Sequence, residues 1–335
     1  MELWTAAEAA DRLRDPVAVG DLRDVPLLAL DLRAGTGEPA PVDAVPCPVV
    51  ALLPTGAACA WDVDLVLTDG SPDVALLADT IEGAAEVLAT AAAAGPRAAG
   101  LLAQVLRATA GLPIGKALAV ESAAYSLLLT GPDFQRWLAE RRVPKPAADE
   151  GHGVVVRRDD ALLELVLDRP AVRNAYDTAI RDGLFEGLSL ALLDPSVERV
   201  VVRGNGPSFC SGGDLREFGS SEDLVAAHGR RTTRHPGPLL HRLGDRAAVH
   251  VHGACVGAGV ELPAFARRVV AAPGTTFRLP EVAMGTIPGA GGTVSLPRRV
   301  GRQRTLLLAL SGIALPVEHA LRWRLVDQME SGVSV

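Results

Sequence analysis

The sequence predicts an α/β fold, because short strand-like segments alternate with amphipathic helical ones after residue 150. A helix is expected over 176–195, where Ile180, Leu184 and Leu188 recur four residues apart and so share one face. Alternation of this kind is typical of sheets that are covered by helices. The expected strands in this half are 161–170, 197–206, 245–253, 267–273 and 275–281.

The chain before residue 150 is expected to be mainly helical, with a few strands. Two strands are predicted at 25–32 and 47–54, and segments rich in alanine and leucine follow them. These segments are broken at Gly-Pro pairs that end at Pro96 and Pro132. A proline fits the first turn of a helix, so each pair is expected to end one helix and start the next.

A linker is expected between the two halves, since the stretch 139–153 is charged and rich in proline. The sequence therefore predicts two domains, 1–150 and 151–335. A chain of 335 residues is long enough for either one large domain or two smaller ones.

Composition excludes several classes of protein. The net charge of −7 and the pI near 5.6 argue against a nucleic-acid-binding surface, which would be basic. The first residues are acidic and amphipathic, so no signal peptide is expected, and no apolar run reaches the length of about 20 residues that spans a membrane. A cytoplasmic protein without a nucleic-acid or membrane partner is therefore expected. The four cysteines lie far apart, which argues against a zinc knuckle and a disulfide framework.

Three glycine-bearing turns follow predicted strands, at 208–215, 255–262 and 284–293. Each could be an ordinary tight connection. Glycine also lets backbone N–H groups approach a ligand closely, and three such turns indicate a binding site. A dinucleotide site fits poorly, because the second turn lacks the third glycine of that motif. The stretch 111–117 is one residue too short for a phosphate-binding loop, and Ala117 replaces its Ser or Thr.

Two glutamates stand beside these turns, Glu261 in "CVGAGVEL" and Glu281 in "PEVAMG". They could be surface carboxylates, but apolar residues flank both. Burial near a second carboxylate favours the protonated form, which suits general acid–base catalysis. His250 and His252 share one face of a strand but lack a third ligand, so no metal site is predicted.

Residues 161–328 resemble the crotonase (enoyl-CoA hydratase/isomerase) superfamily. Four segments carry the resemblance, and the last is the most specific to the hydratase subgroup, in which the two glutamates are also twenty residues apart. The segments are "LDRPAVRNAYD", "VVVRGNGPSFCSGGDLREF", "VHGACVGAGVEL" and "FRLPEVAMGTIPGAGGTVSLPRRVG".

The resemblance implies a spiral of ββα turns (the ClpP/crotonase fold) that binds an acyl-CoA thioester. It implies no cofactor, because coenzyme A is part of the substrate, and a homo-oligomer that is a trimer or a hexamer. Glu261 would activate water and Glu281 would deliver a proton. The backbone N–H groups of Ser211 and Ala258 would form the oxyanion hole. The implied substrate-binding residues are Gly212, Gly213, Asp214 and Gly257.

Several residues depart from the family pattern. Arg267 stands where an aspartate is usual, and Pro263 interrupts the helix that follows the second glycine turn. The family's C-terminal helical region is not found after residue 328, whereas the helices within 116–142 look like that region. Residues 1–150 are therefore interpreted as a degenerate crotonase-like unit whose helices cover the catalytic half.

The preferred function is reversible hydration of a 2-enoyl-CoA to a 3-hydroxyacyl-CoA. Two alternatives remain at this stage. A double-bond isomerase needs only one of the two carboxylates to shuttle a proton. A non-catalytic acyl-CoA-binding subunit would fit the unusual N-terminal half and the departure at Arg267.

Overall fold

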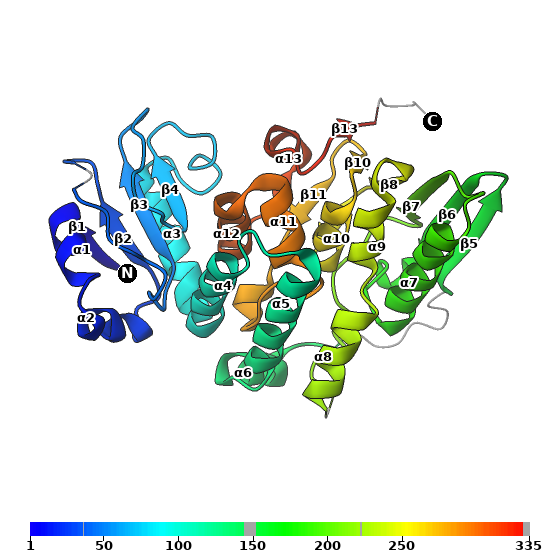
Figure 1. Ribbon diagram of the computed structural model, residues 1–335, viewed down its shortest axis with the longest axis horizontal. Coiled ribbons are helices and arrows are strands. Elements are labelled where there is room, and N and C mark those ends of the chain that lie inside the picture. The colour runs from blue at the N-terminus through cyan, green and yellow to red at the C-terminus, as the bar shows by residue number, and fades with distance from the viewer. Residues whose placement is uncertain (36, 144–151, 222, 331–335) are drawn as a thin grey trace.

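A six-stranded sheet forms the centre of the C-terminal half (Figure 1). The computed structural model describes residues 1–35, 37–143, 152–221 and 223–330. The strand order is β13-β10-β8-β7-β6-β5, and every pair is parallel except β5 with β6. The strands are β5 (Gly153–Asp159), β6 (Leu162–Asp168), β7 (Arg199–Gly204), β8 (Ala247–Val251), β10 (Arg268–Ala271) and β13 (Gln328–Met329).

Helix α7 (Thr178–Leu193) connects β6 to β7, as the sequence predicts. It begins at Asp177, whose side chain accepts a hydrogen bond from the N–H of Ile180. The apolar face of α7 is buried: Ile180, Leu184 and Leu188 are at most 3% exposed. The remaining helices of this half are α8 (Leu224–Thr233), α9 (Pro236–Leu243), α10 (Ala258–Glu261), α11 (Gly292–Val300), α12 (Arg302–Ser311) and α13 (Val317–Trp323).

A small three-stranded sheet carries the two predicted glutamate segments. Its order is β12-β11-β9, with β9 (Ala254–Val256), β11 (Thr276–Arg278) and β12 (Leu315–Pro316). Helix α10 follows β9, and the 3₁₀ helix η5 (Glu281–Met284) follows β11. Since β9 and β11 are parallel neighbours, the segments that follow them leave the sheet at the same end.

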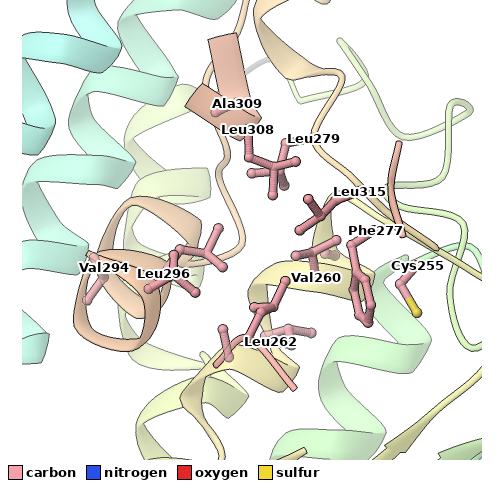
Figure 2. Close-up of a cluster of buried hydrophobic side chains, with 14 of the residues drawn as sticks. Cys255, Val260, Leu262, Phe277, Leu279, Val294, Leu296, Leu308, Ala309 and Leu315 are labelled. Atoms are coloured by element: carbon pink, nitrogen blue, oxygen red, sulfur yellow. The ribbon is translucent and has the colours of Figure 1, made fainter. Parts of the chain in front are cut away.

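The residues that flank the glutamates belong to one buried apolar cluster, shown in Figure 2. Val260 and Leu262 lie on either side of Glu261, and Leu279 lies two residues before Glu281. All three are at most 5% exposed. Their burial fixes the backbone from which both carboxylates project.

The N-terminal half begins with a four-stranded parallel sheet of order β1-β2-β3-β4. Strands β2 and β3 lie within the two predicted segments, 25–32 and 47–54. No strand is predicted from the sequence at β1 or β4. A separate small core, which includes Trp4 and Trp61, lies in this part of the chain. Two short helices accompany the sheet, α1 (Ala6–Arg12) and α2 (Pro16–Asp21). The strands are β1 (Glu2–Thr5), β2 (Leu28–Asp31), β3 (Val49–Leu53) and β4 (Leu65–Thr68).

Four helices connect this sheet to the C-terminal half, and Figure 1 shows them between the two. Their buried side chains, such as Leu88, Leu102 and Leu118, join one continuous core with Leu296 and Leu307 of the C-terminal half. The predicted boundary near residue 150 lies outside the described residues, and the core does not divide there. The helices are α3 (Ile81–Ala94), α4 (Pro96–Ala108), α5 (Ile114–Leu129) and α6 (Pro132–Glu140).

Candidate active site

A cavity of about 580 Å³ lies where the two halves meet. The C-terminal half contributes Glu261, Glu281 and Ala258 to its lining, and the N-terminal half contributes Tyr125 and Phe134. Both glutamates that the sequence singles out therefore share one cavity with helices α5 and α6.

Glu261 is the last residue of α10 and is 2% exposed. Its Oε2 accepts hydrogen bonds from the backbone N–H of Ala290 at 2.7 Å and of Gly292 at 2.9 Å. Burial, together with the nearby carboxylates Glu281 and Glu121, raises the pKa of Glu261 well above its usual value. A carboxyl group with a raised pKa is suited to general acid–base catalysis.

Glu281 begins η5 and is 8% exposed. Its buried Oε2 has no hydrogen-bond partner among the described residues. Burial is the main cause that raises the pKa of Glu281, to about 8. Gly257 makes room for this carboxylate, because a Cβ at Gly257 would lie 2.5 Å from Glu281 Oε1 and the φ angle there is +48°.

Glu121 is a third buried carboxylate at this site, and sequence reasoning missed it. It lies on α5 and is 1% exposed. Its Oε1 accepts a hydrogen bond from Gly291 N–H at 2.8 Å, and its Oε2 accepts from Thr293 N–H at 2.9 Å and Thr293 Oγ1 at 2.7 Å. Burial raises the pKa of Glu121 to about 7. The sequence feature that could have indicated its burial is its position on the same face of α5 as the buried Leu118.

The helices of the N-terminal half support the whole segment from Glu281 to Thr293. At the start of that segment, a Cβ at Gly95 would lie 2.2 Å from the carbonyl oxygen of Val282. Farther along, a Cβ at Gly289 would lie 2.5 Å from the Tyr125 ring. The expectation that these helices cover the catalytic half is in accord with these contacts.

The predicted donor at Ser211 needs a correction. Its backbone N–H donates to the carbonyl of Arg173 at 3.0 Å, and Ser211 does not line the cavity. Gly213, two residues later, does line the cavity, as does Ala258. Neither Gly213 nor Ala258 donates its N–H to another residue in the described part of the chain. The pair of free donors is therefore Gly213 and Ala258.

The other predicted substrate-binding residues have different positions. Asp214 lines the cavity, but its carboxylate pairs with Arg216 and with Arg169 at 3.6 Å, which lowers the pKa of Asp214, mainly through Arg216. Gly212 and Gly257 do not line the cavity: Gly212 lies against Val256, and Gly257 lies against Glu281. Glycine at these two positions shapes the wall rather than contacting the cavity.

The remaining residues that drew attention in the sequence lie away from the cavity. His250 Nδ1 lies 2.9 Å from a carboxylate oxygen of Glu330, and His252 Nε2 lies 2.8 Å from the carbonyl of Gly206. Arg267 forms an exposed ion pair with Asp245. Pro263 ends α10 and starts a 3₁₀ helix, as its position in the sequence suggests.

The family model described as enoyl-CoA hydratase/isomerase matches residues 157–335. The chain belongs to this family. The 2,3-dehydroadipyl-CoA hydratase of Escherichia coli (strain K12) is 35% identical over 52% of this chain and 68% of its own length. An enoyl-CoA isomerase/hydratase of Mycosarcoma maydis is 31% identical over 50% of this chain and 65% of its own length.

Solved structures confirm the crotonase-like α/β fold. An enoyl-CoA hydratase/isomerase from Mycobacterium paratuberculosis superposes with a TM-score of 0.50 at 26% identity, over 54% of this chain and 74% of its own. This chain thus spans about two thirds to three quarters of these family members. Helices α3–α6, with Glu121 and Tyr125, lie outside the residues that the family model matches. Among the described helices, none is long and apolar enough to cross a membrane.

Proposed function

We propose that this enoyl-CoA hydratase/isomerase family member adds water reversibly to a 2-enoyl-CoA thioester and forms a 3-hydroxyacyl-CoA. The observation that carries the proposal is the meeting of Glu261, Glu281 and two free backbone donors at one cavity. The hydratase and isomerase/hydratase names of the relatives support the same type of chemistry.

The proposed reaction uses the two free N–H groups as an oxyanion hole. When water adds to the β carbon of the double bond, negative charge develops on the thioester oxygen. In this proposal, the N–H groups of Gly213 and Ala258, which both line the cavity, donate to that oxygen. In other enzymes, loss of one such donor lowers the rate by about 10²–10³-fold.

The two glutamates carry the proton transfers in this proposal. Glu261 takes a proton from water as the oxygen bonds to the β carbon, and Glu281 gives its proton to the α carbon of the enolate. One carboxyl must therefore be ionised while the other is protonated. Burial raises the pKa of both carboxyls, that of Glu281 to about 8, and the charge of Glu281 further favours the protonated form of Glu261, so the two groups titrate as a pair.

The chemistry needs neither a metal ion nor a redox cofactor, and coenzyme A enters only as part of the substrate. Activity that survives dialysis against EDTA would agree with this; loss of activity that a divalent ion restores would contradict it. Assembly as a trimer or hexamer stays a prediction, which light scattering of the full chain would test.

The experiment that tests the function follows the absorbance of crotonyl-CoA when the purified full chain is added. We expect the absorbance of the conjugated thioester to fall as water adds. Incorporation of deuterium without loss of the enoyl group would instead support an isomerase. Binding of the thioester without either change would support a non-catalytic acyl-CoA-binding subunit.

A further inference from the structure

Three arginines line the cavity, and one of them lacks a carboxylate partner. Arg181 pairs with Asp182, and Arg234 pairs with Asp182 and Glu186. Arg231, on α8, forms no ion pair with any described residue. Its Nε donates to Ser122 Oγ at 3.0 Å, its Nη2 donates to Ser126 Oγ, and its guanidinium lies 5.1 Å from the centroid of the Tyr125 ring.

Arg231 therefore has an unused donor and no direct ion pair, although the nearby Glu121 carboxyl offsets part of its charge. Its Nη1 donates to no acceptor in the described part of the chain. Burial lowers the pKa of Arg231, but an arginine remains charged at neutral pH. A partly buried cation without a partner is costly, and a bound anion would remove that cost.

A second donor without a partner lies on the same wall. His235 is 8% exposed and lines the cavity, and its Nδ1 accepts a hydrogen bond from the N–H of Gly237 at 3.0 Å. That bond places the proton of the neutral ring on Nε2, which has no partner among the described residues. Burial lowers the pKa of His235 to about 4, against a smaller upward effect of the Ala290 backbone, so the ring is neutral and Nε2 is a donor near that backbone.

Tyr125, Arg231 and His235 form what we call the donor wall. Tyr125 lies against Gly289, and His235 Nε2 lies 3.0 Å from the position of a Cβ on Gly291. The residue between these glycines, Ala290, donates to Glu261. The donor wall therefore adjoins the carboxylate that we assign to water activation.

We propose that the donor wall binds a carboxylate carried by the acyl group, so that the preferred substrates are monothioesters of dicarboxylic acids. This inference rests on the proposed function, which sets the orientation of the bound acyl-CoA thioester in the cavity. A purely aliphatic acyl chain would leave the buried His235 Nε2 without an acceptor, which is unfavourable, and would offer no acceptor to the half-buried Arg231. A carboxylate offers acceptors to both, and a guanidinium binds it through charge-assisted hydrogen bonds.

Three buried glutamates lie near the donor wall, and Asp177, Asp214 and Glu217 also line the cavity. Burial raises the pKa of Glu121 to about 7 and of Glu281 to about 8, and it raises that of Glu261 as well. The protonated form of Glu281 is therefore favoured at neutral pH, whereas the proposed reaction requires Glu261 to be ionised. Glu121 also has its own three donors on Gly291 and Thr293, which leaves Arg231 available to a ligand.

The test compares saturated thioesters, which bind but cannot be hydrated. Calorimetry with the full chain measures the Kd of succinyl-, adipyl- and suberyl-CoA against butyryl-, hexanoyl- and octanoyl-CoA. At one chain length or more, we expect the dicarboxylic thioester to bind tighter by about 10-fold, the effect of a charge-assisted pair in a buried site. The Arg231→Gln variant should lose this ratio, and the Arg231→Lys variant should keep part of it.

The matched control is Arg230→Gln, an exposed arginine beside Arg231 on the same helix that does not line the cavity. It should keep the wild-type ratio. Equal binding of both thioesters at every chain length by the wild-type protein would overturn the inference, whether or not the variants fold. So would an Arg231→Gln variant that weakens both thioesters equally, since Arg231 would then contact the coenzyme A common to both.

This binding ratio is independent of the hydration assay. A wild-type ratio near one, with crotonyl-CoA still hydrated, would refute the donor wall and leave the proposed function standing. A clear ratio without any hydration would refute the proposed reaction and leave the donor wall standing.

Discussion

Glu121 and Glu261 come from opposite halves of the chain and bind alternate N–H groups of one short segment. Glu261 accepts from Ala290 and Gly292, whereas Glu121 accepts from Gly291 and Thr293. The four successive donors at the start of α11 are thus divided between two carboxylates. Helix N-termini favour acceptors and negative charge, so this arrangement orders the segment and fixes the orientation of Glu261.

Replacing either proposed catalytic glutamate should abolish hydration. Glu261→Gln and Glu281→Gln keep the shape of the side chain but remove its proton transfer. We expect kcat to fall by about 10²–10⁴-fold in each case, while the Kd of a saturated acyl-CoA changes little. Steady-state kinetics and calorimetry measure the two quantities. Turnover near the wild-type rate in either variant would remove that residue from the mechanism.

Glu121 is expected to act as a positioning residue rather than a catalytic one. Glu121→Gln offers a donor where Gly291 needs an acceptor, so Glu261 should be less well ordered and kcat should fall by about 10-fold. The pH profile of kcat/KM should also shift, because one charge coupled to Glu261 is lost. The control is Glu86→Gln, at an exposed position on α3. An unchanged pH profile with only a lower melting temperature would show a purely structural role.

Gly257→Ala should displace the Glu281 carboxylate. The new Cβ would lie 2.5 Å from Oε1, which is closer than non-bonded atoms can approach. We expect kcat to fall by about 10²-fold, the size of effect that a small misplacement of a reacting group produces. Gly274→Ala is the matched control, because its φ of +75° imposes similar backbone strain but its Cβ would meet open space. Equal losses in both variants would assign the effect to strain alone.

Stability should decrease as the pH rises. The folded-state pKa of Glu281 is about 8, above its usual 4.5, so the folded protein holds a proton that the unfolded chain releases. This contribution to stability is present below pH 4.5 and is lost as pH rises towards about 8. The melting temperature of the wild type, measured from about pH 5 to 9, should fall more steeply than that of Glu281→Gln. Parallel curves would contradict the raised pKa.

The C-terminal half should not function without the N-terminal helices. A fragment that begins at Gly151 lacks α3–α6 and would expose the apolar surfaces of α11 and α12 that they cover. We expect it to aggregate or to lose activity, and co-expression of residues 1–150 to restore it. Size-exclusion chromatography and the hydration assay measure the outcome. A soluble, fully active 151–335 fragment would show that the two halves are independent.

A milder form of the same experiment cuts the full chain instead of truncating it. A protease site placed within residues 144–151 lets the folded protein be cleaved between its halves. Because the halves share one core, the two pieces should remain together on a sizing column and retain activity. Dissociation after cleavage would contradict a shared core.

The sequence predicted the site best where local chemistry is distinctive. Glycine-rich turns beside Glu261 and Glu281 imply close backbone approaches, and the structure brings both carboxylates to one cavity. The free N–H group lies at Gly213, two residues after the predicted donor Ser211. A run such as "CSGGD" does not reveal which N–H an internal carbonyl occupies. In the structure, the Arg173 carbonyl occupies that of Ser211.

Long-range contacts explain what the sequence did not reveal. Glu121 lies in an ordinary Ala/Leu-rich helix, and its partners are in a segment far along the chain. Arg231 and His235 lie in a stretch rich in arginine and histidine that is typical of a solvated surface, yet the fold turns both towards the cavity. Local periodicity predicts which face of a helix is buried, but not which distant polar group meets it.

The hydrogen bonds of Glu121 connect residues that are 170 and 172 positions apart. During synthesis, the segment at Gly291–Thr293 leaves the ribosome only after most of the chain has been made. Until that segment emerges, Glu121 has no hydrogen-bond partners there, and the apolar face of α5 remains exposed to solvent. Folds that depend on such distant contacts assemble slowly and expose apolar surface meanwhile. We therefore expect expression of the full chain to depend on chaperones, because the cavity is built from both halves of the polypeptide.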